Sequence, residues 1–257
     1  MREFFGFGGF QRTPEGAYSW QHLLFVGFTI ALMIGLAILF GIRNRSKDDK
    51  TKNRVLIIAA ILIDSFELFK IILFCVRDDS MAWKRTLPLF LCSIQLITIP
   101  LAAFSKGRIK EAALDFVFIF GILGAIAGTI GAAQNYNAYP VLAFDNVVSA
   151  ITHSISGFCS LYIVISGMDS MKKENIWIVL AILGCFIVLA FIANAIIPYN
   201  YMFLRSDDGT PYFIVTKLVN GNKVLYPIGV IVLFIIYIAI FYGIYYLITK
   251  KNKKCEA

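Results

Sequence analysis

Long apolar runs separated by short polar stretches dominate the pattern of the 257-residue chain. Each run is close to the roughly 20 apolar residues that an α-helix needs to cross the hydrocarbon core of a bilayer. The pattern therefore predicts an all-α, polytopic membrane protein with seven transmembrane helices. We expect them at residues 20–42, 55–76, 87–103, 112–133, 144–167, 176–197 and 228–248.

The segments outside these runs complete a single seven-span domain over residues 1–257. Residues 1–19 are rich in phenylalanine and glycine, and we expect them to form an irregular or interfacial segment. Residues 249–257 form a basic tail. The longest connection, residues 198–227, contains Asn220 and Gly221, which either close a β-hairpin or follow a short interfacial helix.

Basic residues predict the orientation of the spans. Residues 43–54 carry six Lys and Arg, and the connections at 105–111 and 168–175 are also basic. Together with the tail, this side holds fifteen of the 24 Lys and Arg, against eight on the other. By the positive-inside rule the amino terminus lies outside and the carboxyl terminus is cytoplasmic. We expect the protein in the cell membrane, with membrane lipids as its partners.

Composition narrows the class further. Hydrophobic residues make up 59% of the chain and charged residues only 16%, far from the roughly 25% charged balance of soluble domains. The net charge of +8 sits mostly between the spans, so we expect no nucleic-acid partner. The five cysteines show no CxxC or Cys/His metal spacing, which predicts no metal site and no cofactor. The oligomeric state is not encoded in any of these patterns.

Charged residues inside the second span are candidate site residues. Asp64, Glu67 and Lys70 repeat every three residues and are expected to share one helix face. An ionised group at mid-membrane costs roughly 2.5–3.5 kcal/mol on insertion scales, so this face requires a polar environment. Two interpretations remain open: a structural ion pair of Glu67 with Lys70, or a role in holding headgroups or catalytic groups.

The fifth span carries a longer polar stripe around one imidazole. Its members are Asp145, Ser149, Thr152, His153, Ser156 and Ser160. Either they form an interhelical hydrogen-bond network or they line a site. His153 and His22 are the only histidines of the chain, and both are expected in the outer halves of their spans.

A thiol in the third span is predicted at a similar depth. On a continuous helix Cys92 and Gln95 share a face with Pro88 and Ile99. At 1.5 Å per residue, Cys92 lies roughly 10 Å and His153 roughly 13 Å below the outer ends of their spans. A thiol beside an imidazole can form the nucleophilic thiolate, which suits covalent acyl chemistry. The alternative is an inert cysteine at a helix contact.

Glycines give the fourth span a small-residue face that lets helix backbones approach closely. Its members are Gly121, Gly124, Gly128 and Gly131. We expect this face to serve tight helix packing.

Four motifs carry a resemblance to a known family. The run LPLFLCSI from Leu87 resembles the LPLHLCS signature of the YwaF family of bacterial integral membrane proteins, with which eukaryotic transmembrane acyltransferases are grouped. ELFKIIL from Glu67, YPVLAFDNVVSAITHSISGF from Tyr139 and NYMFL from Asn200 fit the same pattern. The resemblance implies an acyl-accepting cysteine at Cys92. Phe90 stands where the family usually has histidine.

Two functions remain open from the sequence. The first is a phospholipid acyltransferase with Cys92 as nucleophile and His153 as base, steadied by Glu67 or Ser149. The second is a non-enzymatic seven-span binding, transport or sensing protein, in which the same polar core holds a small ligand or ion. Besides the four residues just named, this core contains Asp64, Lys70, Gln95 and His22. An assembly factor with a purely structural core is the remaining possibility.

Overall fold

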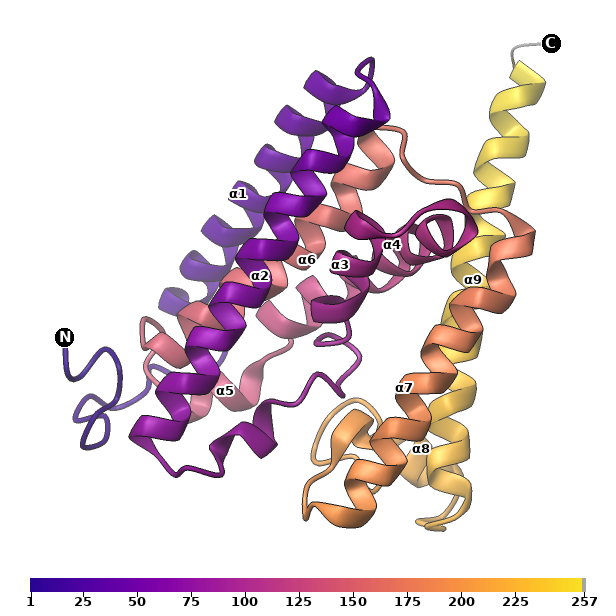
Figure 1. Cartoon of the computed structure of the whole chain (residues 1–257). Helices are drawn as coiled ribbons and strands as arrows, with labels where there is room; N and C mark the ends of the chain where they lie inside the picture. The colour runs from indigo at the N-terminus through magenta and orange to yellow at the C-terminus, as the bar shows by residue number, and fades with distance from the viewer. Residues whose placement is uncertain (256–257) are drawn as a thin grey trace. The chain divides into compact units, whose positions relative to one another are not determined.

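The computed structural model describes the backbone of residues 1–255 and the side chains of residues 1–249. The described residues form helices joined by turns and contain no strand, which confirms the all-α prediction (Figure 1). The chain forms two compact units, Met1–Ser170 and a second that begins at Met171. The single domain predicted over residues 1–257 stays a prediction, and each unit is described by itself.

The first unit is built around α6. Its elements are α1 (Trp20–Asn44), α2 (Asp49–Arg77), the 3-10 helix η1 (Ala82–Thr86), α3 (Gln95–Phe104), α4 (Gly107–Thr129), α5 (Ala133–Ala138) and α6 (Phe144–Ile165). Helix α6 packs against α1, α2 and α4, while α3 packs against α2 and α4 (Figure 1). The polar stripes predicted on the second, third and fifth spans therefore lie in helices that contact one another.

Close packing of α4 against α6 depends on glycine. A Cβ atom added at Gly121 would lie only 2.6 Å from the backbone oxygen of Ser156, so any larger residue would push the two helices apart. This contact confirms the predicted small-residue face at Gly121. Gly131, by contrast, meets only the backbone of Ala127 in its own segment.

The second unit contains two long helices and three short ones. They are η2 (Lys173–Asn175), α7 (Ile176–Ile196), η3 (Tyr201–Phe203), α8 (Phe213–Leu218) and α9 (Leu225–Cys255). Asn194 holds the end of α7 to η3, because its amide accepts from the Tyr201 N–H at 2.7 Å and donates to the Tyr201 oxygen at 3.1 Å. Of the two alternatives predicted for residues 198–227, a β-hairpin or a short helix, the structure contains the short helix, α8. The chain turns after α8 at Asn220 and Gly221, which both have a positive φ.

Five helical stretches are long and apolar enough to cross a membrane. They are Trp20–Asn44, Gly107–Ala138, Phe144–Ile165, Lys173–Ile196 and Leu225–Thr249. Helix α2 has 29 residues but carries charges, and α3 has only 10 residues, which gives a rise of about 15 Å. The protein is thus a multi-pass helical membrane protein, whereas seven spans and the orientation of the termini stay predictions.

The prediction of a continuous helix over residues 87–103 is wrong for the first half of that range. Residues 87–94 form turns, and α3 begins only at Gln95. The hydroxyl of Ser93 accepts from the Phe90 N–H at 3.0 Å and donates to the Phe90 oxygen at 3.1 Å. Such local bonds compete with a helix, and Pro88 has no N–H to contribute to one. Cys92 therefore lies in a turn immediately before α3.

Candidate functional site

Cys92 and His153 lie against neighbouring turns of α4. A Cβ atom added at Gly124 would lie 3.5 Å from Cβ of Cys92, and one added at Gly128 would overlap the imidazole of His153. Residues four apart on a helix are adjacent on one face, so Gly124 and Gly128 form a common floor beneath the thiol segment and the ring. Among the described residues no hydrogen bond joins Cys92 to His153.

The hydrogen bond at Nδ1 fixes the protonation pattern of His153. Nδ1 lies 2.7 Å from the backbone oxygen of Ser149 and 3.4 Å from its hydroxyl. Because a carbonyl oxygen only accepts, Nδ1 carries the proton in the neutral ring and Nε2 carries the lone pair. Within the described part of the chain Nε2 has no hydrogen-bond partner. The ring is therefore oriented with its basic nitrogen open.

Helix α2 carries a partly buried ion pair. The Lys70 ammonium lies 2.6 Å and 2.7 Å from the two carboxylate oxygens of Glu67. Helix α2, which carries the pair, packs against both α3 and α6. The structure thus brings Glu67 and Lys70 together as the sequence suggested.

Asp64 does not join this pair. Its side chain is exposed on α2, and it takes part in no hydrogen bond or ion pair with the residues that the structure describes. The three-residue spacing places Asp64 one turn from Glu67, but the rotation of the helix carries it out of the packed interior.

Gln95 lies one turn after the thiol. Its backbone N–H donates to the Cys92 oxygen at 3.4 Å, and its side chain is fully buried. The amide oxygen accepts a hydrogen bond from the Thr98 hydroxyl at 3.1 Å, while the amide nitrogen has no hydrogen-bond partner in the part of the chain that the structure describes.

His22 occupies a separate, fully bonded environment. Its Nδ1 accepts from the Tyr18 N–H at 2.9 Å, and its Nε2 lies 3.4 Å from the Thr129 oxygen. The ring also stacks on Tyr136, with centroids 3.8 Å apart. Both nitrogens are engaged, so His22 ties α1 to the end of α4 and has no free nitrogen for the polar core in which it was predicted.

The hydroxyls of the α6 stripe bond to backbone oxygens rather than to a common site. Thr152 and Ser156 donate within α6, and Ser160 donates to the Phe118 oxygen of α4 at 2.6 Å. These contacts support the packing interpretation for the three hydroxyls. Only Ser149, through its contacts with the His153 ring, assists the imidazole.

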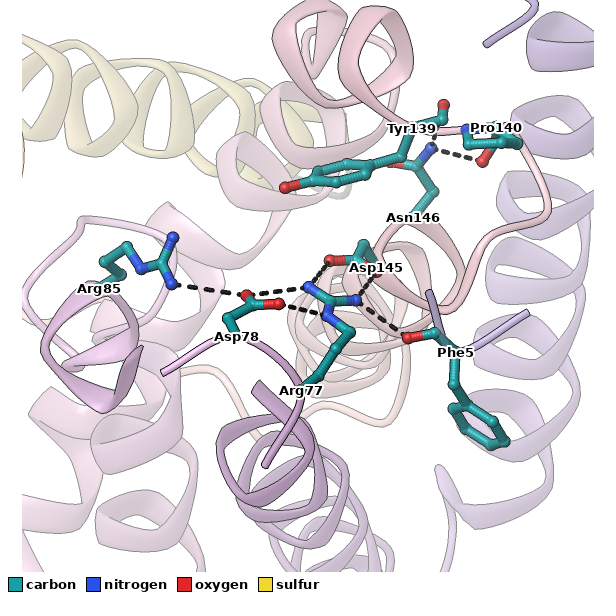
Figure 2. A network of polar contacts seen from close by, with 8 residues as sticks. All are labelled: Phe5, Arg77, Asp78, Arg85, Tyr139, Pro140, Asp145 and Asn146. Carbon is teal, nitrogen blue, oxygen red and sulfur yellow. Dashed lines mark hydrogen bonds and ion pairs between the residues drawn. The ribbon is translucent and has the colours of Figure 1, made fainter. Parts of the chain in front are cut away.

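Asp145, the first member of the stripe, instead belongs to a cluster at the ends of α2 and α6 (Figure 2). The Arg77 guanidinium donates to both oxygens of Asp145 at 2.7 and 3.0 Å, to Asp78 at 2.6 Å and to the Phe5 oxygen at 3.2 Å. This bidentate pair is almost completely buried. Figure 2 shows Arg77 between the two carboxylates and the amino-terminal segment, so one side chain holds three parts of the unit together.

Arg77 was missed in the sequence interpretation. The available signal was a pair of opposite charges at the ends of two spans, Arg77 just after the second and Asp145 in the first turn of the fifth. The same guanidinium affects Asp78 outside the span, because its hydrogen bond lowers the pKa of that carboxyl below the usual value.

These features define a multi-pass helical membrane protein, and in its first unit Cys92 and His153 lie against neighbouring turns of α4. Residues 17–245 match the model of the TMEM164 family, and the chain belongs to this family. The match is consistent with the transmembrane acyltransferase grouping, while the narrower identification as a YwaF protein stays a prediction. Searches of curated proteins and of solved structures gave no significant match.

Proposed function

We propose that the protein is a phospholipid acyltransferase of the cell membrane, in which Cys92 carries the acyl chain as a thioester and His153 is the general base. The observation that carries the proposal is the open Nε2 of His153 beside the turn of Cys92, both resting on one face of α4. A base held in one tautomer next to a thiol is the minimal arrangement for nucleophilic acyl transfer.

In the first half-reaction His153 Nε2 takes the proton of the Cys92 thiol. The thiolate attacks the ester carbonyl carbon of a phospholipid acyl chain, and a C–S bond forms. The C–O bond to the glycerol oxygen then breaks, and the leaving oxygen takes the proton from the imidazolium. The products are a thioester on Cys92 and a lysophospholipid.

The second half-reaction reverses these roles. The free hydroxyl of another lysophospholipid gives its proton to His153 Nε2 and attacks the thioester carbonyl. The C–S bond breaks, and the Cys92 sulfur recovers a proton from the imidazolium. A new phospholipid leaves, no oxidation occurs, and the protein returns to its starting state.

The family motifs also support the proposal. Cys92 occupies the position at which the resemblance implies an acyl-accepting cysteine, and the chain is a member of the TMEM164 family. Phe90 stands at a family histidine position, so the proposal assigns the base to α6 and uses no group at position 90.

The test is acyl transfer in phospholipid nanodiscs with an isotope-labelled lysophospholipid as acceptor. Cys92→Ala is expected to abolish formation of labelled phospholipid. Cys159→Ala is the matched control, because Cys159 is buried in an apolar cluster with Leu56 and Ile99 and should be dispensable for transfer. Transfer by Cys92→Ala at the wild-type rate would overturn the proposal. Tight ligand binding without any transfer would favour the non-enzymatic alternative.

A further inference from the structure

Gln95 presents a buried hydrogen-bond donor that the protein leaves open. Its side chain has no exposed surface, and its amide nitrogen has no hydrogen-bond partner among the described residues. Burying an unpaired N–H costs free energy, so such groups are rare in folded proteins and call for an explanation. In a membrane no bulk water is available to satisfy it.

Rotation of the amide does not remove the open donor. Among the described residues, the Gln95 amide makes its one side-chain hydrogen bond with the Thr98 hydroxyl, which also lies 3.3 Å from the Ile94 oxygen. The amide nitrogen carries two hydrogens, and Thr98 can accept at most one of them in either orientation of the amide. At least one N–H therefore stays available, and Thr98 holds the amide in place.

The backbone places Gln95 next to Cys92 in the turn that begins α3. The Gln95 N–H bonds to the Cys92 oxygen, so the two residues lie one turn apart on the same stretch of chain. The Gly124 contact places the Cys92 side of this turn against α4, beside the ring of His153. An acyl carbonyl bonded to the sulfur would thus have an amide donor one turn away and the imidazole beside it.

We propose that the Gln95 side-chain amide donates a hydrogen bond to the carbonyl oxygen of the acyl ester, and that this bond stabilises the negative charge on that oxygen as the thiolate attacks. The assignment rests on the proposed acyltransferase function for its catalytic part. Its binding part does not require turnover: the ligand is a lipid ester whose carbonyl oxygen accepts the hydrogen bond from Gln95. Removal of one such donor lowers kcat by about 10²–10³-fold in characterised enzymes.

The first experiment compares two reactions of the same thiol in Gln95→Leu, which keeps a similar volume and removes the donor. The rate of Cys92 acylation by a phospholipid ester is expected to fall by about 10²-fold or more. Alkylation of Cys92 by iodoacetamide develops no oxyanion, so its rate should stay within about 3-fold of the wild type. Thr98→Val, which frees the amide to rotate, should lower acylation less than Gln95→Leu does.

Equal losses in acylation and alkylation would assign Gln95 a purely structural role and overturn the inference. Unchanged acylation in Gln95→Leu, with normal alkylation, would overturn it as well. Both outcomes can be read from a variant that is folded, because alkylation reports the environment of Cys92 directly.

A second measurement separates the inference from the proposed function. The Cys92→Ser variant cannot form a thioester. A phospholipid with one ¹³C-labelled ester carbonyl is added to this variant at a molar ratio of one lipid to one protein. The infrared band of the bound carbonyl is expected at lower frequency than in Cys92→Ser/Gln95→Leu. A shifted band with no acylation of the wild type would keep the carbonyl site and overturn only the acyl transfer. Identical bands in the two proteins would overturn the carbonyl site.

Discussion

The two histidines of the chain contact α4 at adjacent residues, yet they differ in what their rings leave open. His153 packs over Gly128, bonds Ser149 through Nδ1 and keeps Nε2 free. His22 bonds the Thr129 oxygen through Nε2, accepts at Nδ1 and stacks on Tyr136. Both residues are equally scarce, and both are expected in the outer halves of their spans. Only the bonding separates a histidine that holds helices together from one that can accept a proton.

A similar contrast divides the ionic clusters of the first unit. Arg77 and Asp145 satisfy each other with two parallel hydrogen bonds, and Asp78 and Phe5 complete the donors of the guanidinium (Figure 2). Glu67 and Lys70 also pair, but they do so within one turn of α2, the helix that packs against α3 and α6. We therefore expect substitutions in the first cluster to change stability and substitutions around the second to change chemistry.

The largest expected difference is between His153→Ala and His22→Ala. The loss of the general base should slow acylation of Cys92 by about 10²-fold or more, with little change in thermal stability. His22→Ala loses two hydrogen bonds and a stacked ring, which should cost roughly 2–4 kcal/mol of unfolding free energy while the folded fraction keeps its acylation rate. Acylation rates and thermal unfolding in the same detergent check both expectations. Reversed effects of the two substitutions would break the comparison.

A smaller effect is expected for Gly128→Ala. The added Cβ would overlap the ring of His153 and displace Nε2, which should lower the acylation rate by about 10-fold or more, since small misplacements of a catalytic group are costly. Gly35→Ala in α1 is the control, because nothing lies within 4 Å of the added atom there. That substitution should leave acylation unchanged and raise helix stability by about 0.5–1 kcal/mol. Equal acylation rates in the two variants would remove Gly128 from the site.

The smallest effect concerns the pH dependence of the Arg77 cluster. The hydrogen bond from Arg77 lowers the pKa of Asp78 below its ordinary value of 3.8. A lowered folded-state pKa stabilises the fold above the ordinary value, and this contribution disappears as the pH falls through the folded-state pKa. The difference in melting temperature between wild type and Asp78→Asn should therefore be present at pH 7 and shrink below about pH 4. A difference that is constant down to pH 2 would contradict this role of the ion pair.

Long apolar helices were predictable because a bilayer leaves one solution for a run of about 20 apolar residues. Helix α1 extends only two residues past the predicted end at residue 42, and α7 ends at Ile196, one residue before the predicted end. The predicted outer connection after the fourth span contains the short helix α5. Short elements escape such prediction because few residues report them.

The candidate site was only partly predictable. Cys92, His153, Glu67 and Gln95 stood out as polar residues inside apolar runs, and the structure places them in contacting helices and turns. The turn at Cys92 could not be read from periodicity, because side-chain bonds of Ser93 produce it. The pairing of Glu67 with Lys70 follows from their three-residue spacing. Which carboxylate pairs with Arg77, and which histidine keeps a free nitrogen, depends on tertiary contacts that no spacing along the chain reports.

The central claim is that Cys92 carries an acyl chain, and mass spectrometry of the protein purified with native lipids tests it most directly. Digestion should yield a peptide in which Cys92 has gained the mass of a fatty acyl group, and hydroxylamine should remove that mass. The adduct should be absent from the peptides of Cys75, Cys159 and Cys185 and should form much more slowly in His153→Ala. A Cys92 peptide that stays unmodified, even after prolonged incubation with phospholipid, would contradict the account.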